Sequence, residues 1–170
     1  MAIKVLVFES DPTFAETVRT GLLKYGCEVS VVDDANNGLQ AASREKPDLI
    51  LLAIELPRMN GFSVCNKLKR DPALKDVPLI IMSSESTEET FEQHRRLRTH
   101  AEDYIHKPIA FVDLLPRISA QLPLPEAGAA PTLRDGLSSR INSGKRASIA
   151  LLRWRNSSYS ASEISGASFM

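Results

Sequence analysis

Five residues at the predicted ends of strands are the candidates for chemistry in this sequence. They are Glu9, Ser10, Ala53, Ser83 and Lys107. Singly, a carboxylate, a hydroxyl or an amine at such a position is an ordinary loop, cap or strand-end group. The methyl group of Ala53 can neither act as a nucleophile nor bind a metal ion. Because the carboxyl ends of parallel strands open onto one crevice, we expect the five residues to lie together.

The apolar pattern predicts the elements that position these residues. The run at 49–54 is apolar throughout and is followed by Pro57 and Gly61, which is typical of a strand buried on both faces. Strands that alternate with helices at this short spacing predict an α/β fold, a doubly wound parallel sheet of five strands flanked by helices. The strands are expected at 3–8, 27–32, 49–54, 77–82 and 101–106, and the helices at 12–25, 35–45, 62–70, 87–100 and 111–122.

Composition limits the remaining classes of protein. The net charge of the 170 residues is zero, with a small negative balance in 1–122 and a small positive balance in 123–170, so nucleic-acid binding is not indicated. The sequence has neither a signal peptide nor an apolar run of membrane length, which predicts a cytoplasmic location away from membranes. Cys27 and Cys65 do not have the spacing of metal ligands.

The periodic pattern stops at Pro123. The following residues are first rich in Pro, Gly and Ala and then rich in Ser. This composition predicts a linker and a disordered tail over 123–170, so that 1–122 forms the folded domain.

Five motifs resemble the receiver domain of two-component response regulators, over residues 3–122. They are Val5–Pro12 (VLVFESDP), Pro47–Ala53 (PDLILLA), Pro57–Gly61 (PRMNG), Val77–Ser84 (VPLIIMSS) and Ala101–Pro108 (AEDYIHKP). The resemblance implies a CheY-like, flavodoxin-like sheet with strand order 2-1-3-4-5 and a place in a phosphorelay. In that family an acidic pair follows the first strand, and an Asp that accepts phosphate ends the third strand. A Thr or Ser ends the fourth strand, and a Lys ends the fifth.

Four positions keep the side chains that the receiver family would imply. Glu9 matches the first acidic residue, and Ser83 matches the hydroxyl at the end of the fourth strand. Lys107 matches the amine at the end of the fifth strand. Tyr104 matches the aromatic residue that precedes the Lys and reports the switch in that family.

Two positions depart from the family. Ser10 replaces the second acidic residue, and Ala53 replaces the phosphate-accepting Asp. Phosphoryl transfer to a receiver needs a carboxylate nucleophile and Mg²⁺, and a methyl group supplies neither the nucleophile nor a metal ligand. We therefore expect no phosphorylation, no catalytic residue, no metal, no cofactor and no enzyme activity.

Further motifs resemble the FrzS-type pseudo-receivers of gliding-motility proteins. They are Leu51–Leu56, Asn60–Gly61, Cys65–Lys69 and Gln93–Tyr104. This resemblance implies a protein-interaction module in bacterial signalling or gliding motility that works without phosphorylation. FrzS-type proteins continue into a long coiled coil, whereas residues 123–170 contain no heptad pattern.

The predicted helix at 87–100 has two readings. Its acidic residues come early and Arg95, Arg96 and Arg98 come late, which the helix dipole favours on a solvated surface. Receivers also use the face of their fourth helix, fifth strand and fifth helix for partners, so these arginines and Tyr104 are candidate contacts to a cytoplasmic signalling or motility protein.

Three other classes of protein compete with a pseudo-receiver. A working receiver in a phosphorelay could use a non-standard acceptor such as Glu55, two residues beyond Ala53. A flavodoxin-like enzyme is disfavoured because Glu9 and Asp11 would repel a cofactor phosphate and no glycine fingerprint is present. A transcription factor is disfavoured because residues 123–170 contain too few apolar positions for a helix-turn-helix domain.

Overall fold

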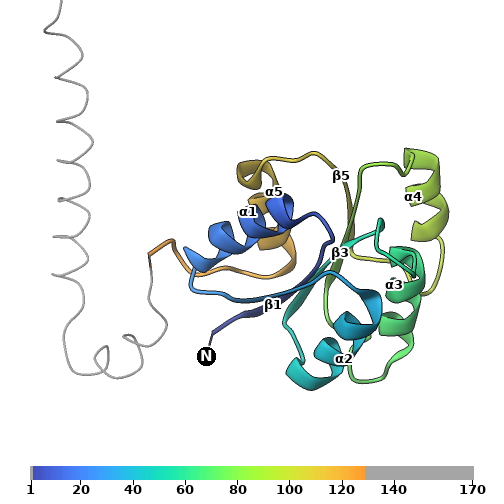
Figure 1. Cartoon of the computed structure of the whole chain (residues 1–170), viewed down its shortest axis with the longest axis horizontal. Helices are drawn as coiled ribbons and strands as arrows, with labels where there is room; N and C mark the ends of the chain where they lie inside the picture. The colour runs from blue at the N-terminus through green and yellow to red at the C-terminus, as the bar shows by residue number, and fades with distance from the viewer. Residues whose placement is uncertain (1, 129–170) are drawn as a thin grey trace, which may run out of the picture. The chain divides into compact units, whose positions relative to one another are not determined.

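The computed structural model describes residues 2–128 as a five-stranded parallel sheet with helices on both faces (Figure 1). The strand order is β2-β1-β3-β4-β5, as the sequence predicts. The strands are β1 (Lys4–Phe8), β2 (Glu28–Val32), β3 (Leu49–Ala53), β4 (Leu79–Ser83) and β5 (Asp103–His106). The helices are α1 (Pro12–Leu23), α2 (Ala35–Glu45), α3 (Gly61–Arg70), α4 (Glu88–Arg95) and α5 (Phe111–Gln121).

The central strand β3 is buried along its whole length, which agrees with its unbroken apolar sequence. Its side chains alternate between two apolar layers. Leu49 and Leu51 face one layer with Val5 and Val7 of β1, and Leu52 faces the other layer. The two layers need cover on both sides of the sheet, and the helices provide it.

Helices α1 and α5 cover one face of the sheet, and α2, α3 and α4 cover the other (Figure 1). Val18 of α1 and Ile118 of α5 are fully buried on the first face. Leu68 of α3 and Phe91 of α4 are buried on the second face. Each helix buries one apolar stripe, which is the pattern of a doubly wound sheet.

Side-chain caps start four of the five helices. Asp11, Asp34, Asn60 and Thr87 each accept a hydrogen bond from a backbone N–H in the first turn of α1, α2, α3 and α4, respectively. Such caps satisfy backbone donors that have no partner inside the helix. They also fix the loops between strand ends and helices, where the candidate site lies.

Helix α4 is shorter than the sequence predicts. The expected helix over 87–100 ends at Arg95, and residues 96–99 form turns. Leu97, in the turn beyond the end of α4, is 46% exposed. Only Phe91 and His94 of α4 are buried, so the apolar face of the helix ends one turn earlier than the predicted pattern.

Residues 123–128, which the sequence places in the linker, still contact the domain. Leu124 packs against the layer beneath α1 and α5, and the backbone N–H of Gly128 donates to the carbonyl of Lys24 at 2.7 Å. The rest of the predicted linker and disordered tail lies outside the described residues. Within 2–128, no helix is both long and apolar enough to cross a membrane.

The turn from β3 into α3 depends on a close approach of two backbone segments. The N–H of Gly61 donates to the carbonyl of Ile54 at 3.0 Å. A Cβ atom at position 61 would lie 2.4 Å from the Ala53 carbonyl oxygen and 2.7 Å from the Ile54 Cα. Glycine is therefore required where α3 begins against the end of β3.

We expect Gly61→Ala to destabilise the domain by about 1–3 kcal/mol, because the added methyl group would overlap backbone atoms that cannot rotate away. The exposed Ser63→Ala, two residues later in α3, is the matched control and should change the free energy of unfolding by less than about 0.5 kcal/mol. Urea unfolding followed by circular dichroism measures both variants. Equal stability of the two variants would contradict the close approach.

Candidate functional site

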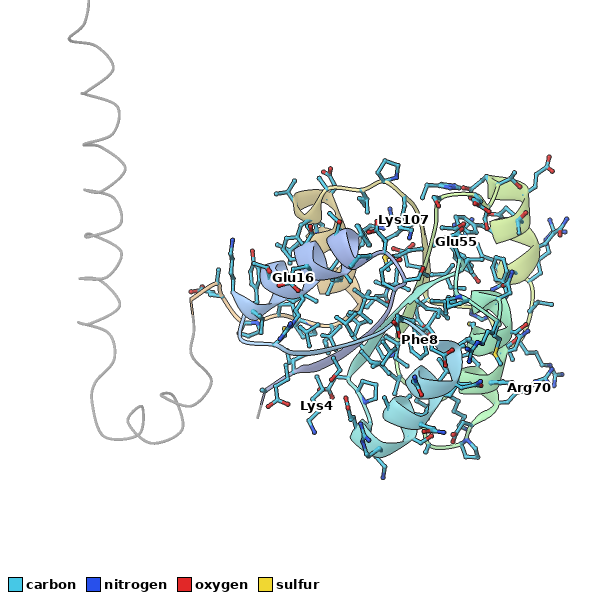
Figure 2. All side chains as sticks on the ribbon, viewed as in Figure 1. Lys4, Phe8, Glu16, Glu55, Arg70 and Lys107 are labelled. Atoms are coloured by element: carbon cyan, nitrogen blue, oxygen red, sulfur yellow. The ribbon has the colours of Figure 1, made fainter. Side chains whose placement is uncertain are left out.

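The carboxyl ends of β1, β3, β4 and β5 bring together the predicted residues Glu9, Ala53, Ser83 and Lys107. Glu9, Ala53 and Lys107 continue the side-chain rows that face α1 and α5. Figure 2 shows Lys107 close to Glu55 at the end of the sheet opposite Lys4, where β1 begins. The predicted residues therefore gather at the expected edge of the sheet.

Glu9 and Lys107 form a buried ion pair at the centre of the crevice. The Nζ atom of Lys107 lies 2.9 Å from Oε2 of Glu9, and the two side chains are 12% and 1% exposed. The backbone N–H of Asp11 donates to the other oxygen, Oε1, at 3.0 Å. Because a lone buried carboxylate would be costly, the ion pair with Lys107 compensates for the burial of Glu9.

Ala53 and Ser10 are the two departures from the receiver pattern, and they differ in their surroundings. Ala53 is completely buried and ends β3. Ser10 is exposed, and its hydroxyl donates to the backbone carbonyl of Glu55 at 2.9 Å. The hydroxyl of Ser10 therefore fixes the loop after β3 rather than pointing at Glu9.

Glu55 enters the crevice and is the residue that the sequence-based site omitted. Its Oε1 atom accepts a hydrogen bond from the hydroxyl of Ser83 and a longer one, at 3.4 Å, from the backbone N–H of Glu85. Its Oε2 atom lies 4.0 Å from Nζ of Lys107. The sequence gives only one indication that Glu55 belongs to the site. Glu55 follows Ala53 by two residues, and in an extended strand side chains two residues apart point to the same side of the sheet.

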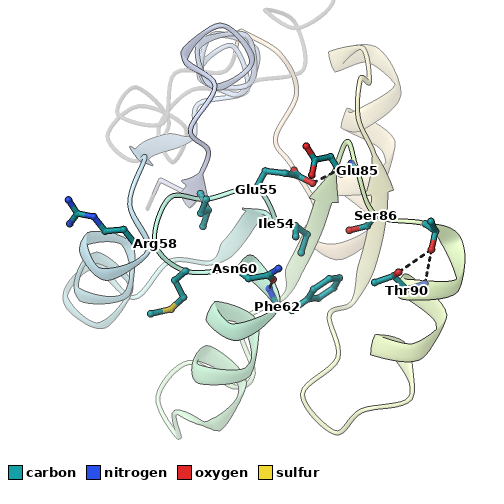
Figure 3. Close-up of a pocket in the computed structure, with 11 residues that line it drawn as sticks. Ile54, Glu55, Arg58, Asn60, Phe62, Glu85, Ser86 and Thr90 are labelled. Atoms are coloured by element: carbon teal, nitrogen blue, oxygen red, sulfur yellow. Dashed lines mark hydrogen bonds between the residues drawn. The ribbon is translucent and has the colours of Figure 1, made fainter.

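A groove of about 710 Å³ adjoins the crevice between the β3–α3 loop and the β4–α4 loop. Figure 3 shows Glu55 and Glu85 at one side of this groove and Phe62 at the start of α3. Thr87 and Thr90, at the start of α4, line it as well. The groove joins the strand ends to the first turn of α4.

The crevice does not present the ligands that a Mg²⁺ ion needs. Mg²⁺ prefers several oxygen ligands in octahedral geometry, usually with carboxylates among them. Position 53 offers a methyl group, the hydroxyl of Ser10 is bonded to a carbonyl, and Glu9 is paired with Lys107. Within residues 2–128 no group of three or more His, Cys, Asp or Glu side chains could hold a metal ion.

Tyr104 points into the domain and forms a buried hydrogen bond with His94 of α4. Its hydroxyl accepts the backbone N–H of Ala101 at 3.0 Å and is hydrogen-bonded to Nδ1 of His94 at 2.6 Å. The tyrosine is only 4% exposed. The structure thus corrects the prediction that Tyr104 offers a surface to a partner.

Burial shifts the pKa values of both members of this pair. It lowers the pKa of His94 below its ordinary value of 6.5, and the nearby His100 adds to this effect. Burial also raises the pKa of Tyr104 to about 12. His94 is therefore neutral at physiological pH, and its buried Nε2 atom has no hydrogen-bond partner among the described residues.

The three predicted arginines occupy different positions. Arg95, the last residue of α4, is paired with Glu88 and Glu92, and its guanidinium lies 4.8 Å from the centre of the Tyr104 ring. Arg96 caps the helix, and Arg98 lies in the following turn. Arg96 and Arg98 are exposed, whereas Arg95 is partly buried against its own domain.

The fold and the strand-end residues together define a CheY-like signalling domain. The response regulator receiver domain family matches residues 5–119, and the chain belongs to this family. The chain is 33% identical over 122 residues to the DNA-binding response regulator MtrA of Mycolicibacterium smegmatis. That match covers 72% of this chain and 51% of MtrA, so the chain spans about half the length of that relative.

Two further matches cover most of the length of the other protein. Protein PilG of Pseudomonas aeruginosa is 30% identical over 121 residues, which cover 71% of this chain and 88% of PilG. The BeF3-activated N-terminal receiver domain of Klebsiella pneumoniae RstA is 28% identical with a TM-score of 0.63, and the match covers 71% of this chain and 98% of that domain. Both matches support the domain assignment made from the strand ends.

The His94–Tyr104 pair predicts that acid destabilises the domain. The pKa of His94 is lower in the folded than in the unfolded state. Below about pH 6.5, His94 therefore binds a proton more readily in the unfolded chain than in the folded domain. The free energy of unfolding should thus decrease between about pH 7.5 and pH 5.5. His94→Gln, which keeps an acceptor for Tyr104 but cannot titrate, should lose this part of the pH dependence.

Urea unfolding of the wild type and of His94→Gln over this pH range makes the comparison. The exposed His100 and His106 are present in both proteins and cancel. Parallel pH profiles for the two proteins would contradict the assignment of a neutral, buried His94.

Proposed function

We propose that this receiver domain is a pseudo-receiver, which is not phosphorylated and works as a protein-interaction module in bacterial signalling. It is not an enzyme and needs no cofactor. The observation that carries the proposal is Ala53, a fully buried methyl group at the end of β3, where the receiver family implies an Asp. A phosphoryl group cannot be attached to this side chain.

The contacts inside the crevice support one standing conformation. Ser83 is bonded to Glu55, Lys107 is paired with Glu9, and Tyr104 is bonded to His94 in the interior. A conformational switch requires a ligand or modification that favours one of two states. With no acceptor at position 53, the output must come from this conformation or from a partner that selects another one.

A receiver that uses Glu55 as its acceptor is the competing function. Glu55 is the only carboxylate besides Glu9 that the described residues place within 4.0 Å of Lys107. Its carboxylate already accepts hydrogen bonds from the Ser83 hydroxyl and the Glu85 N–H. A phosphoryl group on Glu55 would have to replace that carboxylate at the same donors, so the geometry disfavours this chemistry.

We further propose a cytoplasmic location and a role in gliding motility. Support comes from the FrzS-type motifs, of which Cys65–Lys69 lies in α3 and Gln93–Tyr104 runs from α4 into β5. DNA binding is part of the printed name of MtrA, but this chain spans only about half of that protein. The motility role does not depend on DNA binding.

Small phosphodonors provide the direct test. We expect no covalent phosphate after the full chain is incubated with acetyl phosphate and Mg²⁺, because no free carboxylate stands at the end of β3. Intact-mass spectrometry measures the addition. A hydroxylamine-labile addition of one phosphoryl group to the wild type would overturn the proposal, and its absence from Glu55→Gln would assign it to Glu55.

The matched control restores the residues that the receiver family implies. Ser10→Asp and Ala53→Asp together return a second acidic residue and an acceptor to the crevice. If this double variant gains a phosphate while the wild type does not, the negative result for the wild type reflects its residues and not the assay.

The turn after α4 is the surface that we propose for partner binding. Arg96, Leu97 and Arg98 are consecutive and exposed, and Leu97 is 46% accessible. Two cations on either side of an exposed leucine suit a partner that presents acidic and apolar groups, because charge guides the encounter and apolar area stabilises the complex. Arg95 is excluded from this surface because it stabilises its own domain.

Reversing the exposed charges should therefore weaken partner binding without unfolding the domain. We expect Arg96→Glu with Arg98→Glu to reduce recovery of specific partners by about tenfold or more in a pull-down from the source cell. Arg19→Glu with Arg44→Glu, on the distant helices α1 and α2, is the matched control and should keep the partners. Equal recovery with both double variants would rule out this surface.

A further inference from the structure

We infer that the Glu55 carboxylate is a built-in ligand of the crevice, which occupies an oxyanion site that inorganic phosphate would bind in its absence. The inference rests on the proposed function, because it explains how a receiver without an acceptor at position 53 keeps its crevice in one arrangement.

Two hydrogen-bond donors and one cation lie next to the Glu55 carboxylate. They are the hydroxyl of Ser83, the backbone N–H of Glu85 and the ammonium of Lys107. The Ser83 oxygen itself accepts the backbone N–H groups of Glu85, at 3.2 Å, and Ser86, at 2.8 Å. Its lone pairs are thus engaged and its proton is directed at Glu55, which makes this hydroxyl a donor to an anion.

The backbone of Glu55 is held so that its side chain reaches these donors. Its carbonyl accepts the hydroxyl of Ser10 after β1. The residue before it, Ile54, donates its N–H to the carbonyl of Met82 in β4 and accepts the N–H groups of Leu56 and Gly61. These hydrogen bonds fix the backbone of Glu55 between β1 and β4. From this position its carboxylate can extend across the end of β3 to Ser83.

The residue at position 53 makes this arrangement electrostatically possible. Glu9 already places one carboxylate against Lys107. An Asp at 53 would add a further negative charge next to Glu55, and crowded carboxylates oppose one another's ionisation. With a methyl group at 53, Lys107 faces two carboxylates among residues 2–128, Glu9 at 2.9 Å and Glu55 at 4.0 Å.

The site still has capacity for an anion with more oxygens than a carboxylate. The Oε2 atom of Glu55 is buried without a hydrogen bond within residues 2–128, and its distance to Lys107 exceeds that of a hydrogen bond. A tetrahedral oxyanion could approach Ser83, Glu85 N–H and Lys107 together. We therefore expect phosphate to bind once the Glu55 carboxylate is removed.

The test is a titration of the full chain with inorganic phosphate, at ionic strength matched with chloride, followed by the amide NMR signals of Ser83, Glu85 and Ser86. We expect no saturable shift in the wild type and a saturable shift at millimolar phosphate in Glu55→Ala. Glu85→Ala, which removes an exposed carboxylate from the same groove, should behave as the wild type. Adding Ser83→Ala to Glu55→Ala should weaken the response.

Glu55→Gln keeps the shape of the side chain and removes its charge, and it should respond between the wild type and Glu55→Ala. The inference is overturned if the wild type responds like Glu55→Ala, or if both Glu55 variants keep native spectra and do not respond. Inorganic phosphate transfers no phosphoryl group, so failure here leaves the pseudo-receiver proposal standing. That proposal fails separately, through a covalent phosphate in the mass spectrum.

Discussion

The balance of charge around Lys107 is the constraint on which the crevice depends. Its ammonium is nearly buried and holds the fully buried carboxylate of Glu9 at 2.9 Å. Removing either partner would leave the other charge uncompensated in the interior, which typically costs several kcal/mol. The third charge, that of Glu55, comes from the loop after β3 and not from the end of the strand. The charged side chains of Lys107, Glu9 and Glu55 are thus held together although the acceptor position carries a methyl group.

The crevice is connected to the proposed partner surface by a continuous set of contacts. Ser83 binds the N–H of Ser86, and the next residue, Thr87, caps α4. Helix α4 carries His94, whose Nδ1 is hydrogen-bonded to the hydroxyl of Tyr104 from β5. The exposed turn with Arg96 follows directly. These contacts favour one position of α4, so a partner would meet a surface that is already formed.

The apolar pattern predicted the alternating strands and helices of the sheet, and the resemblance to receivers implied its strand order. The structure places Glu9, Ser83 and Lys107 at the strand ends, where Lys107 is paired with Glu9 and Ser83 is bonded to Glu55. The sequence failed where side-chain direction in loops decides the outcome. Glu55 lies beyond the strand, and only the hydrogen bonds of the β3–α3 loop turn it inward. The inward Tyr104 depends on its pairing with His94, a tertiary contact that periodicity does not encode.

The most direct test of the account uses beryllium fluoride, the activator of the RstA receiver domain from Klebsiella pneumoniae. Adding it with Mg²⁺ to the full chain, and following the amide signals of Ser83, Ser86 and Tyr104 by NMR, asks whether the crevice responds to an analogue of a phosphoryl group. Because a methyl group stands at position 53 and Glu55 occupies the donors, the account predicts spectra that match those in Mg²⁺ and fluoride alone. Specific, saturable shifts of these signals would contradict it.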